Sequence, residues 1–294
     1  MPNLQLKKKK DVSSFRKIAI GTWQTAYDPQ VYGTLELRME HALRYLADFR
    51  AQTGKRLTIS HMMAKAVAAA LTEMPDANAV LRYNRLYLRQ DIGVFFQVVM
   101  DDEGHGKVDL SGATVYEVDK KSLVEIIDDF SAKVERVRKR EDPALEKTRK
   151  SFLGIPYFLL NRVLKILSFF TGTLNWDMRW AGIPRDPFGS VMITNIGTLG
   201  LETAYVPLVP YSRVPIILAV GAIQNVPVVD DDKVVPGKLM RVHATFDHRV
   251  IDGFHAAVMS RVLRTWMQHP YEHFDRLDRA LPAASDKDDA ATGA

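Results

Sequence analysis

The chain of 294 residues contains no cysteine. This absence excludes disulfide bonds, thiolate metal sites and a cysteine nucleophile, and it is compatible with a reducing compartment. The sequence also lacks any run of about 18 or more uncharged apolar residues, so no membrane-spanning helix is predicted. The opening stretch, MPNLQLKKKKDVSSF, has four lysines without an apolar run behind them, which argues against a secretory signal. We therefore expect a cytoplasmic protein.

The motifs of three other protein classes are missing as well. No nucleic-acid reader motif accompanies the net charge of +5, so we expect no nucleic-acid partner. The positive charge could equally well serve to bind an anionic small molecule. The eight histidines form no metal-like spacing, so we expect no metal ion. No glycine-rich phosphate loop of the Rossmann or Walker type is present.

What is present is a continuous series of predicted strands and helices. The stretch YGTLELRME alternates as a strand does, whereas TISHMMAKAVAAALTEMPDAN predicts a buried helix that begins after Thr58 or Ser60 and ends before Pro75. Later, VPIILAVGAI and LMRVHATFDH predict two strands joined by the Asp-rich hairpin VVDDDKVVPG. The order indicates one α/β or α+β domain over residues 14–278, with a flexible basic arm (1–13) and a disordered tail (279–294).

The stretch ATFDHRVIDGFHAA contains the strongest candidate for a catalytic group. His248 stands where a predicted strand ends, four residues before the pair Asp252-Gly253. Strand ends that lead into loops often present catalytic groups, and a neutral imidazole can take up a proton near pH 7. A solvated histidine beside an ordinary Asp-Gly turn fits these residues equally well. His243 and His255 are expected to be structural.

The stretch KLMRVHATFDHRVIDGFHAA resembles the C-terminal motif of dihydrolipoamide acyltransferases, the E2 components of 2-oxoacid dehydrogenase complexes. Chloramphenicol acetyltransferase shares the His-x-x-x-Asp-Gly core and the fold. Further stretches are similar to the family in the same order, among them SSFRKIAIGTW, AVAAALTEMPDAN, DKKSLVEI and VMITNIGTLG. Outside an insertion, the resemblance covers roughly residues 13–140 and 188–275. It implies a chloramphenicol-acetyltransferase-like α/β fold, a mixed sheet flanked by helices, in a homotrimer whose active sites lie between subunits.

The resemblance also assigns roles to individual residues. His248 matches the general base that deprotonates the attacking thiol, and Thr194 matches a hydroxyl residue that stabilises the oxyanion, supplied by the neighbouring subunit. Asp252 matches an aspartate that pairs with an arginine to hold the loop, for which Arg16 is the best-placed candidate. Asn195 and Gly253 support the site by shaping turns. Coenzyme A and lipoamide are implied as substrates, and no tightly bound cofactor is expected.

Three departures from the family bear on function. The chain begins almost at the catalytic domain. We therefore expect a lipoyl group supplied in trans, from a lipoyl-carrying protein or from dehydrogenase-complex subunits, or else a different acyl carrier or coenzyme A alone. The stretch VDLSGATVYEVDKKSL replaces a more apolar segment and is expected to alter the substrate channel. The insertion 141–189 has no counterpart in the family's core, and within it Pro156–Thr171 predicts an apolar helix with a small basic face.

The insertion leaves three interpretations open. Its helix could pack on its own trimer or bury a contact in a higher assembly, lie on an anionic membrane surface through residues 156–171, or form a lid or wall for a hydrophobic acyl chain. The membrane interpretation would make the protein peripheral to the membrane. For the whole chain we expect an acyltransferase acting between coenzyme A and a thiol such as dihydrolipoamide. A non-catalytic trimeric scaffold and an O- or N-acetyltransferase of the drug-modifying type are the alternatives.

Overall fold

The computed structural model describes residues 2–10, 29–101, 108–138 and 156–277. A six-stranded mixed sheet has the order β2-β9-β8-β7-β5-β6, and a three-stranded sheet has the order β1-β4-β3. The strands are β1 (Leu6–Lys8), β2 (Gln30–Arg38), β3 (Ala79–Arg82), β4 (Arg85–Arg89), β5 (Val94–Asp101), β6 (Val108–Val115), β7 (Val191–Asn195), β8 (Ile216–Asp230) and β9 (Lys233–Asp247). The α-helices are α2 (Glu40–Thr53), α3 (Ile59–Glu73), α4 (Leu123–Arg138), α6 (Tyr157–Ser168), α7 (Gly253–Gln268) and α8 (Pro270–His273).

The direction of the strands decides where each strand end lies. β7 runs parallel to both of its neighbours, β5 and β8. The pairs β2–β9, β8–β9 and β5–β6 are antiparallel. β8 runs parallel to β7, and β9 runs antiparallel to β8. The carboxyl end of β9 therefore lies beside the amino end of β7, and the carboxyl ends of β7 and β9 lie at opposite ends of the strands.

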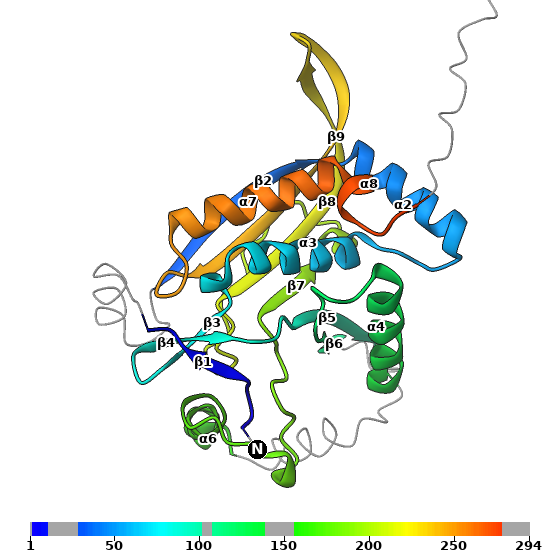
Figure 1. Ribbon diagram of the computed structural model, residues 1–294. Coiled ribbons are helices and arrows are strands. Elements are labelled where there is room, and N and C mark those ends of the chain that lie inside the picture. Colours follow the sequence, from blue (N-terminus) through cyan, green and yellow to red (C-terminus); the bar gives the residue numbers. More distant parts are fainter. Residues whose placement is uncertain (1, 11–28, 102–107, 139–155, 278–294) are drawn as a thin grey trace, which may run out of the picture.

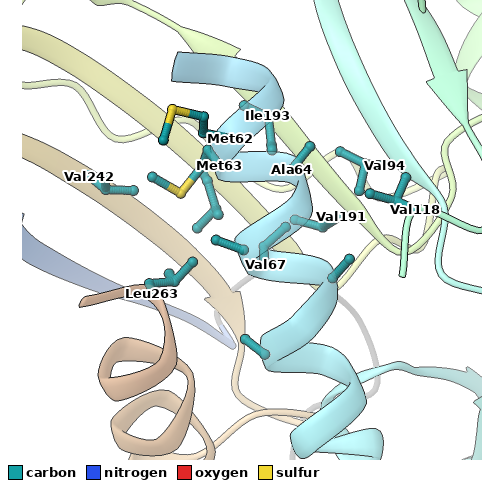
Figure 2. Packing of buried hydrophobic residues seen from close by; sticks show 14 of the residues in the cluster. Met62, Met63, Ala64, Val67, Val94, Val118, Val191, Ile193, Val242 and Leu263 are labelled. Carbon is teal, nitrogen blue, oxygen red and sulfur yellow. The ribbon is translucent and has the colours of Figure 1, made fainter. Parts of the chain in front are cut away.

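Helices α2, α3 and α7 cover one face of the six-stranded sheet and form the main core with it (Figure 1). Figure 2 shows α3 in the middle of this core, with Met63 and Val67 surrounded by side chains from the sheet and from α7. Alternate residues of β7, Val191 and Ile193, point into the same layer and are buried. Burying side chains of this size stabilises the fold by roughly 1.5–3 kcal/mol each.

The ends of these helices follow the signals in the sequence. The Thr58 side chain accepts a hydrogen bond from the backbone N–H of His61 and so caps α3, as predicted. The helix ends before Pro75, also as predicted. α2 ends at Gly54, which adopts a left-handed conformation with φ of 67°.

The N-terminal residues differ from the prediction. A flexible arm was expected over residues 1–13, but β1 pairs with β4 and Leu4 is buried. Asn175 fixes the arm further, because its amide nitrogen donates to the Leu4 carbonyl oxygen at 2.7 Å. The lysines of this segment remain at the surface of the small sheet, where Lys9 pairs with Asp76. The prediction is therefore wrong for residues 2–10, and residues 11–13 lie outside the described chain.

The predicted helix of the insertion is present as α6, followed by the single π-turn Phe169–Thr173. Two arginines of the main body hold this turn. The Arg213 guanidinium donates to the Ser168 and Thr173 hydroxyls at 2.9 and 2.7 Å, and Arg82 donates to the Thr173 carbonyl at 2.8 Å. The turn that follows α6 is thus held on its own chain, while Ile166 and Phe169 remain exposed. Binding to a membrane surface stays a prediction.

β8 and β9 continue beyond the sheet as a two-stranded hairpin that projects from the body (Figure 1). A β-bulge between Val220 and Ile223 marks where the hairpin leaves the sheet. The turn at its tip is made by Asp231 and Asp232, both with positive φ, so the predicted Asp-rich hairpin is confirmed. Among the described helices, none combines the length and apolarity that crossing a membrane requires.

Candidate active site

His248 directly follows β9 in a tight turn that leads to α7. The Asp247 carbonyl accepts hydrogen bonds from the backbone N–H groups of Val250 and Ile251, both at 2.9 Å, which closes the turn. The Asp247 carboxylate is held by Arg249 through hydrogen bonds of 2.7 and 2.9 Å. The chain is thereby fixed on both sides of His248, which is itself half-buried.

The hydrogen bond of the His248 ring determines which nitrogen carries the proton. Its Nδ1 lies 2.9 Å from the Ile251 carbonyl oxygen. A carbonyl oxygen can only accept, so Nδ1 must donate, and in the neutral ring Nε2 keeps the lone pair. The turn therefore prepares Nε2 to take up a proton, as a general base requires.

Asp252 begins α7 and caps it. Its carboxylate oxygen Oδ1 accepts hydrogen bonds from the backbone N–H groups of Phe254 and His255, at 3.0 and 3.2 Å, and lies 2.6 Å from Nδ1 of His255. A carboxylate at a helix N-terminus is also favoured by the helix dipole. Arg16 lies outside the described residues, so its pairing with Asp252 stays a prediction. His255, which was expected to be structural, lies against this capping carboxylate.

Thr194 lies near the carboxyl end of β7, on the face of the sheet that the helices do not cover. Met192 and Thr194 share this face, whereas Ile193 between them points into the core. Within the described residues the Thr194 hydroxyl makes no hydrogen bond, so its proton is available to an incoming group. Thr194 is half-buried and lines a cavity of about 530 Å³.

Asn195 and Gly197 shape the turn that follows β7. The Asn195 amide nitrogen lies 3.2 Å from the Ser60 hydroxyl at the start of α3, and its amide oxygen accepts from the backbone N–H of Thr198 at 3.2 Å. A Cβ on Gly197 would lie 2.7 Å from the backbone of Gly221 and Ala222, so the close approach there requires glycine. Gly253 has open space around its Cα, and nothing in the described chain explains a need for glycine there.

His243 has a structural role, as expected. Its Nε2 lies 2.9 Å from the Glu202 carbonyl oxygen and must donate to it, so Nδ1 accepts from the Thr34 hydroxyl at 3.0 Å. The Thr34 oxygen lies in turn 2.6 Å from the Tyr205 hydroxyl. Both ring nitrogens are thus used to hold the segment after β7 against the sheet.

Within one chain, Thr194 and His248 lie far apart. Thr194 pairs with Ala219 of β8, which pairs with His243 of β9. β9 ends four residues beyond His243, which lies level with Thr194 across the sheet. The turn that carries His248 therefore begins roughly 13 Å away from Thr194 along the strand direction. Direct proton transfer needs heavy atoms within roughly 3 Å. The two residues therefore cannot serve one reaction centre within a single chain.

The cavity beside Thr194 contains residues that the sequence analysis did not single out. Phe95, Met192 and Ile217 contribute to its floor. Tyr116, directly after β6, and Phe188 of the insertion also line it. The stretch that was expected to alter the substrate channel thus does line the cavity next to Thr194. No group of histidine, aspartate and glutamate residues suited to holding a metal ion occurs in the described part of the chain.

Comparison with known proteins connects this geometry to a family. The family model described as 2-oxoacid dehydrogenases acyltransferase (catalytic domain) matches residues 5–152 and 188–274. The dihydrolipoyllysine-residue acetyltransferase component of the acetoin cleaving system of Bacillus subtilis is 21% identical over 217 residues, which is 74% of this chain and 43% of that protein. The chain thus spans less than half the length of this relative.

Two solved structures have the same fold. The dihydrolipoamide acetyltransferase of Azotobacter vinelandii superposes with a TM-score of 0.61 and 19% identity, covering 90% of this chain and 93% of that one. A probable dihydrolipoamide acetyltransferase from Listeria monocytogenes gives a TM-score of 0.59 and 17% identity, covering 89% and 94%. The predicted α/β architecture, a mixed sheet flanked by helices, is confirmed.

Proposed function

Because this chain belongs to the family of 2-oxoacid dehydrogenase acyltransferase catalytic domains, we propose that it transfers acyl groups between coenzyme A and a thiol such as dihydrolipoamide. The observation that carries the proposal is the hydrogen bond from His248 Nδ1 to the Ile251 carbonyl, which leaves Nε2 as the basic nitrogen. This arrangement supplies what thiol activation needs, a neutral base in a fixed orientation.

The reaction begins when His248 Nε2 accepts the proton of the attacking thiol. The thiolate then adds to the carbonyl carbon of the acyl thioester and forms a tetrahedral intermediate with a negative oxygen. Collapse of the intermediate breaks the bond to the leaving thiolate, which takes the proton back from His248. The step is balanced, with one thioester bond formed, one broken, and no external oxidant or reductant.

The Thr194 hydroxyl is proposed to stabilise the negative oxygen of the intermediate. A hydroxyl that has no other hydrogen-bond partner among the described residues can turn towards the charge as it develops, and a half-buried position strengthens this interaction. Removing a donor of this kind typically lowers the rate by roughly a hundredfold to a thousandfold. Asp252 supports the site by capping α7, which fixes the end of the His248 turn.

The active site is proposed to form between subunits of a homotrimer. The opposite strand ends that carry Thr194 and His248 support this, because the two residues can meet only if they come from different chains. Lipoamide is proposed to arrive on a lipoyl-carrying partner protein, which approaches the site as a substrate. Larger assemblies of trimers, as in the solved cubic core of a pyruvate dehydrogenase complex, are the corresponding proposal for the assembled state.

The test is acyl transfer from a panel of acyl-coenzyme A donors to dihydrolipoamide. We expect His248→Ala to lower kcat by a factor of about 100 or more. Thr194→Ala should lower kcat by roughly a hundredfold, whereas Thr194→Ser should keep most of the activity because it retains the hydroxyl. His41→Ala is the matched control, since His41 is an exposed histidine of α2 outside the site.

Each other outcome has a definite meaning. Full activity of His248→Ala would contradict its role as the base. Release of coenzyme A only when a hydroxyl or amine acceptor is present would identify an O- or N-acetyltransferase. Absence of transfer with every donor and acceptor would favour a non-catalytic trimeric scaffold.

A further inference from the structure

Three aromatic rings form one wall of the cavity beside Thr194. The ring of Phe188 lies between those of Phe95 and Tyr211, with centroids 5.5 and 5.4 Å away. All three residues line the cavity. Phe95 in turn covers Gly112 of β6, where an added Cβ would lie 2.0 Å from the phenyl ring. The absence of a side chain at Gly112 therefore lets the Phe95 ring lie flat over the strand.

The floor of the cavity leads directly to Thr194. Phe95, Met192 and Ile217 are paired across β5, β7 and β8, and they form one apolar row on the sheet. Thr194 is two residues further along β7 on the same face. A group bound over this row thus begins at the proposed oxyanion site and extends away from it along the apolar side chains.

The wall on the insertion side is held rigidly. The Tyr116 hydroxyl donates to the Asp186 carbonyl at 2.7 Å, and the Thr114 hydroxyl donates to the Pro187 carbonyl. Burial raises the pKa of Tyr116, so this phenol stays protonated and keeps its hydrogen bond. Gly189, with φ of 62°, lets the chain pass so close to Gly93 that a Cβ would lie 2.5 Å from its carbonyl oxygen.

Part of this wall lies outside the match to the family model. The family model matches residues up to 152 and again from 188, so the segment in between has no counterpart in it. Pro184 and Pro187 of that segment line the cavity and place Phe188 over its floor. The cavity volume of about 530 Å³ is many times the roughly 10–15 Å³ that a single water molecule requires.

Among the described residues that line the cavity, the charged side chains both belong to α4. Lys133 and Arg136 extend from α4. The Lys133 ammonium group is already occupied, because it donates to the Thr114 carbonyl at 2.7 Å and pairs with Asp129 at 2.9 Å. The aromatic and aliphatic floor and the occupied lysine favour an uncharged apolar group inside.

We propose that this cavity binds the hydrocarbon chain of the transferred acyl group, so that the substrates are thioesters of hydrophobic acyl chains longer than acetyl. The inference rests on the proposed acyltransferase function. Phe188 determines specificity by contact with the acyl chain, together with the apolar row of Phe95, Met192 and Ile217. The turn that carries Phe188, which Tyr116 and Thr114 hold in place, sets the width of the cavity.

The experiment separates binding from turnover. Binding of acetyl-, butyryl-, hexanoyl- and octanoyl-coenzyme A is measured by calorimetry on the full-length His248→Ala protein, and kcat and KM are measured on the protein with His248 intact. We expect affinity to rise about threefold to fourfold per added methylene until the cavity is filled. Val209→Trp fills the cavity from the segment after β7, and Phe188→Ala removes the wall. In both variants the affinity should increase less with acyl-chain length.

The control is Leu199→Ala, since Leu199 is exposed in the turn after β7 and does not line the cavity. It should keep the dependence on chain length, and the cavity variants should bind acetyl-coenzyme A as the parent protein does. The inference would be overturned if affinity did not change with acyl-chain length, or if both cavity variants kept the same dependence of affinity on chain length as the parent protein. Transfer of acetyl groups would in either case leave the proposed function standing. Tighter binding of succinyl- than of butyryl-coenzyme A would also overturn it, because a carboxylate would then be recognised. Binding that depends on chain length without any transfer would overturn the proposed function and leave the cavity assigned.

Discussion

At the scale of single residues, the most unusual buried group is His61 of α3. Its ring lies against those of Phe96 and Phe130 and the residue is only 4% exposed. Its Nδ1 has no hydrogen-bond partner in the described part of the chain. Burial lowers the pKa of His61 to about 4. The folded protein therefore keeps this histidine neutral through the whole range in which an ordinary histidine becomes charged.

This gives a prediction for stability against pH. The unfolded chain binds a proton at His61 near pH 6.5, whereas the folded protein binds it only near pH 4. Stability is therefore lost as the pH falls between these values, by roughly 3 kcal/mol at most. We expect His61→Leu to lose less stability than the parent protein between pH 7 and 4.5 in urea unfolding. The exposed His41→Leu serves as the control, and equal losses in all three proteins would contradict the lowered pKa.

Two glycines near the proposed catalytic residues make a matched pair for a second prediction. Gly197→Ala places a methyl group 2.7 Å from the backbone of β8, so we expect a loss of roughly 1–3 kcal/mol and a displaced Thr194. Gly253→Ala meets nothing within 4 Å and should keep full stability or gain a few tenths of a kcal/mol. Thermal unfolding of both variants measures the difference, and a stable Gly197→Ala protein would refute the steric argument.

Single residues also differ in how far the sequence could reveal them. His248 and Asp252 belong to a contiguous motif, and Thr58 and Gly54 are local helix signals, so all four were accessible. The contact of His255 with the Asp252 carboxylate is equally local, at a helical spacing of three residues, and could have been inferred. Phe95 and Phe188 could not, because only the folded sheet brings these two apolar residues together.

At the scale of elements, two arginines hold the turn that follows α6, and the half-buried Arg213 makes more of these contacts than Arg82 does. Arg213 donates to Ser168, Thr173 and the Leu81 carbonyl, and burial lowers its pKa to about 10, far above neutrality. Gly172 allows this contact, since a Cβ there would lie 2.5 Å from the Arg213 guanidinium. The charge is held by neutral oxygen acceptors of the turn that follows α6.

We therefore expect Arg213→Met to release this turn. Three acceptors would lose their donor, and the protein should lose about 3 kcal/mol of stability. Hydrogen exchange of residues 157–173 should become much faster, while that of α3 changes little. Arg179→Met is the control because Arg179 is exposed and, within the described residues, bonds only to Asp177 two residues away. Unchanged protection of α6 in Arg213→Met would show that other contacts hold the helix.

The elements that were predicted correctly are those whose signal is local. α3 and the β8–β9 hairpin have regular apolar spacing and clear ends. β1 was missed because its lysines suggest a solvated arm, and its pairing with β4 joins residues about 80 positions apart. The ordered turn around Asp186 was missed for the same reason, since it is held by Tyr116 and Arg89 from distant parts of the sequence.

At the scale of the whole molecule, the separation of Thr194 and His248 within one chain leads to a complementation test. If each site combines His248 of one subunit with Thr194 of its neighbour, trimers assembled from equal amounts of His248→Ala and Thr194→Ala chains should have about a quarter of their sites intact. Co-refolding the two chains should then restore about that share of activity, and light scattering should give three times the chain mass of 33.2 kDa. Activity no higher than that of the separate variants would place both residues in one subunit.

The fold class was accessible from the order of predicted strands and helices together with the family resemblance. The homotrimer was implied by the family resemblance alone, because the composition of a surface does not indicate which surface meets a second copy. The geometry of the sheet adds the missing constraint, since antiparallel β9 carries His248 to the edge opposite Thr194.

The same sheet order also affects how the chain folds while it is being synthesised. β2 is an edge strand whose sole neighbour in the sheet is β9, and the pair joins Gln30 to Asp247 across roughly 200 intervening residues. At ribosomal rates of roughly 5–20 residues per second, β2 waits about 10–40 s before its partner exists. During that interval its alternating apolar side chains, including Leu35 and Leu37, have no sheet to join. The nascent chain is therefore expected to depend on chaperones until β9 leaves the ribosome, and its yield should respond to chaperone supply more than its final stability would suggest.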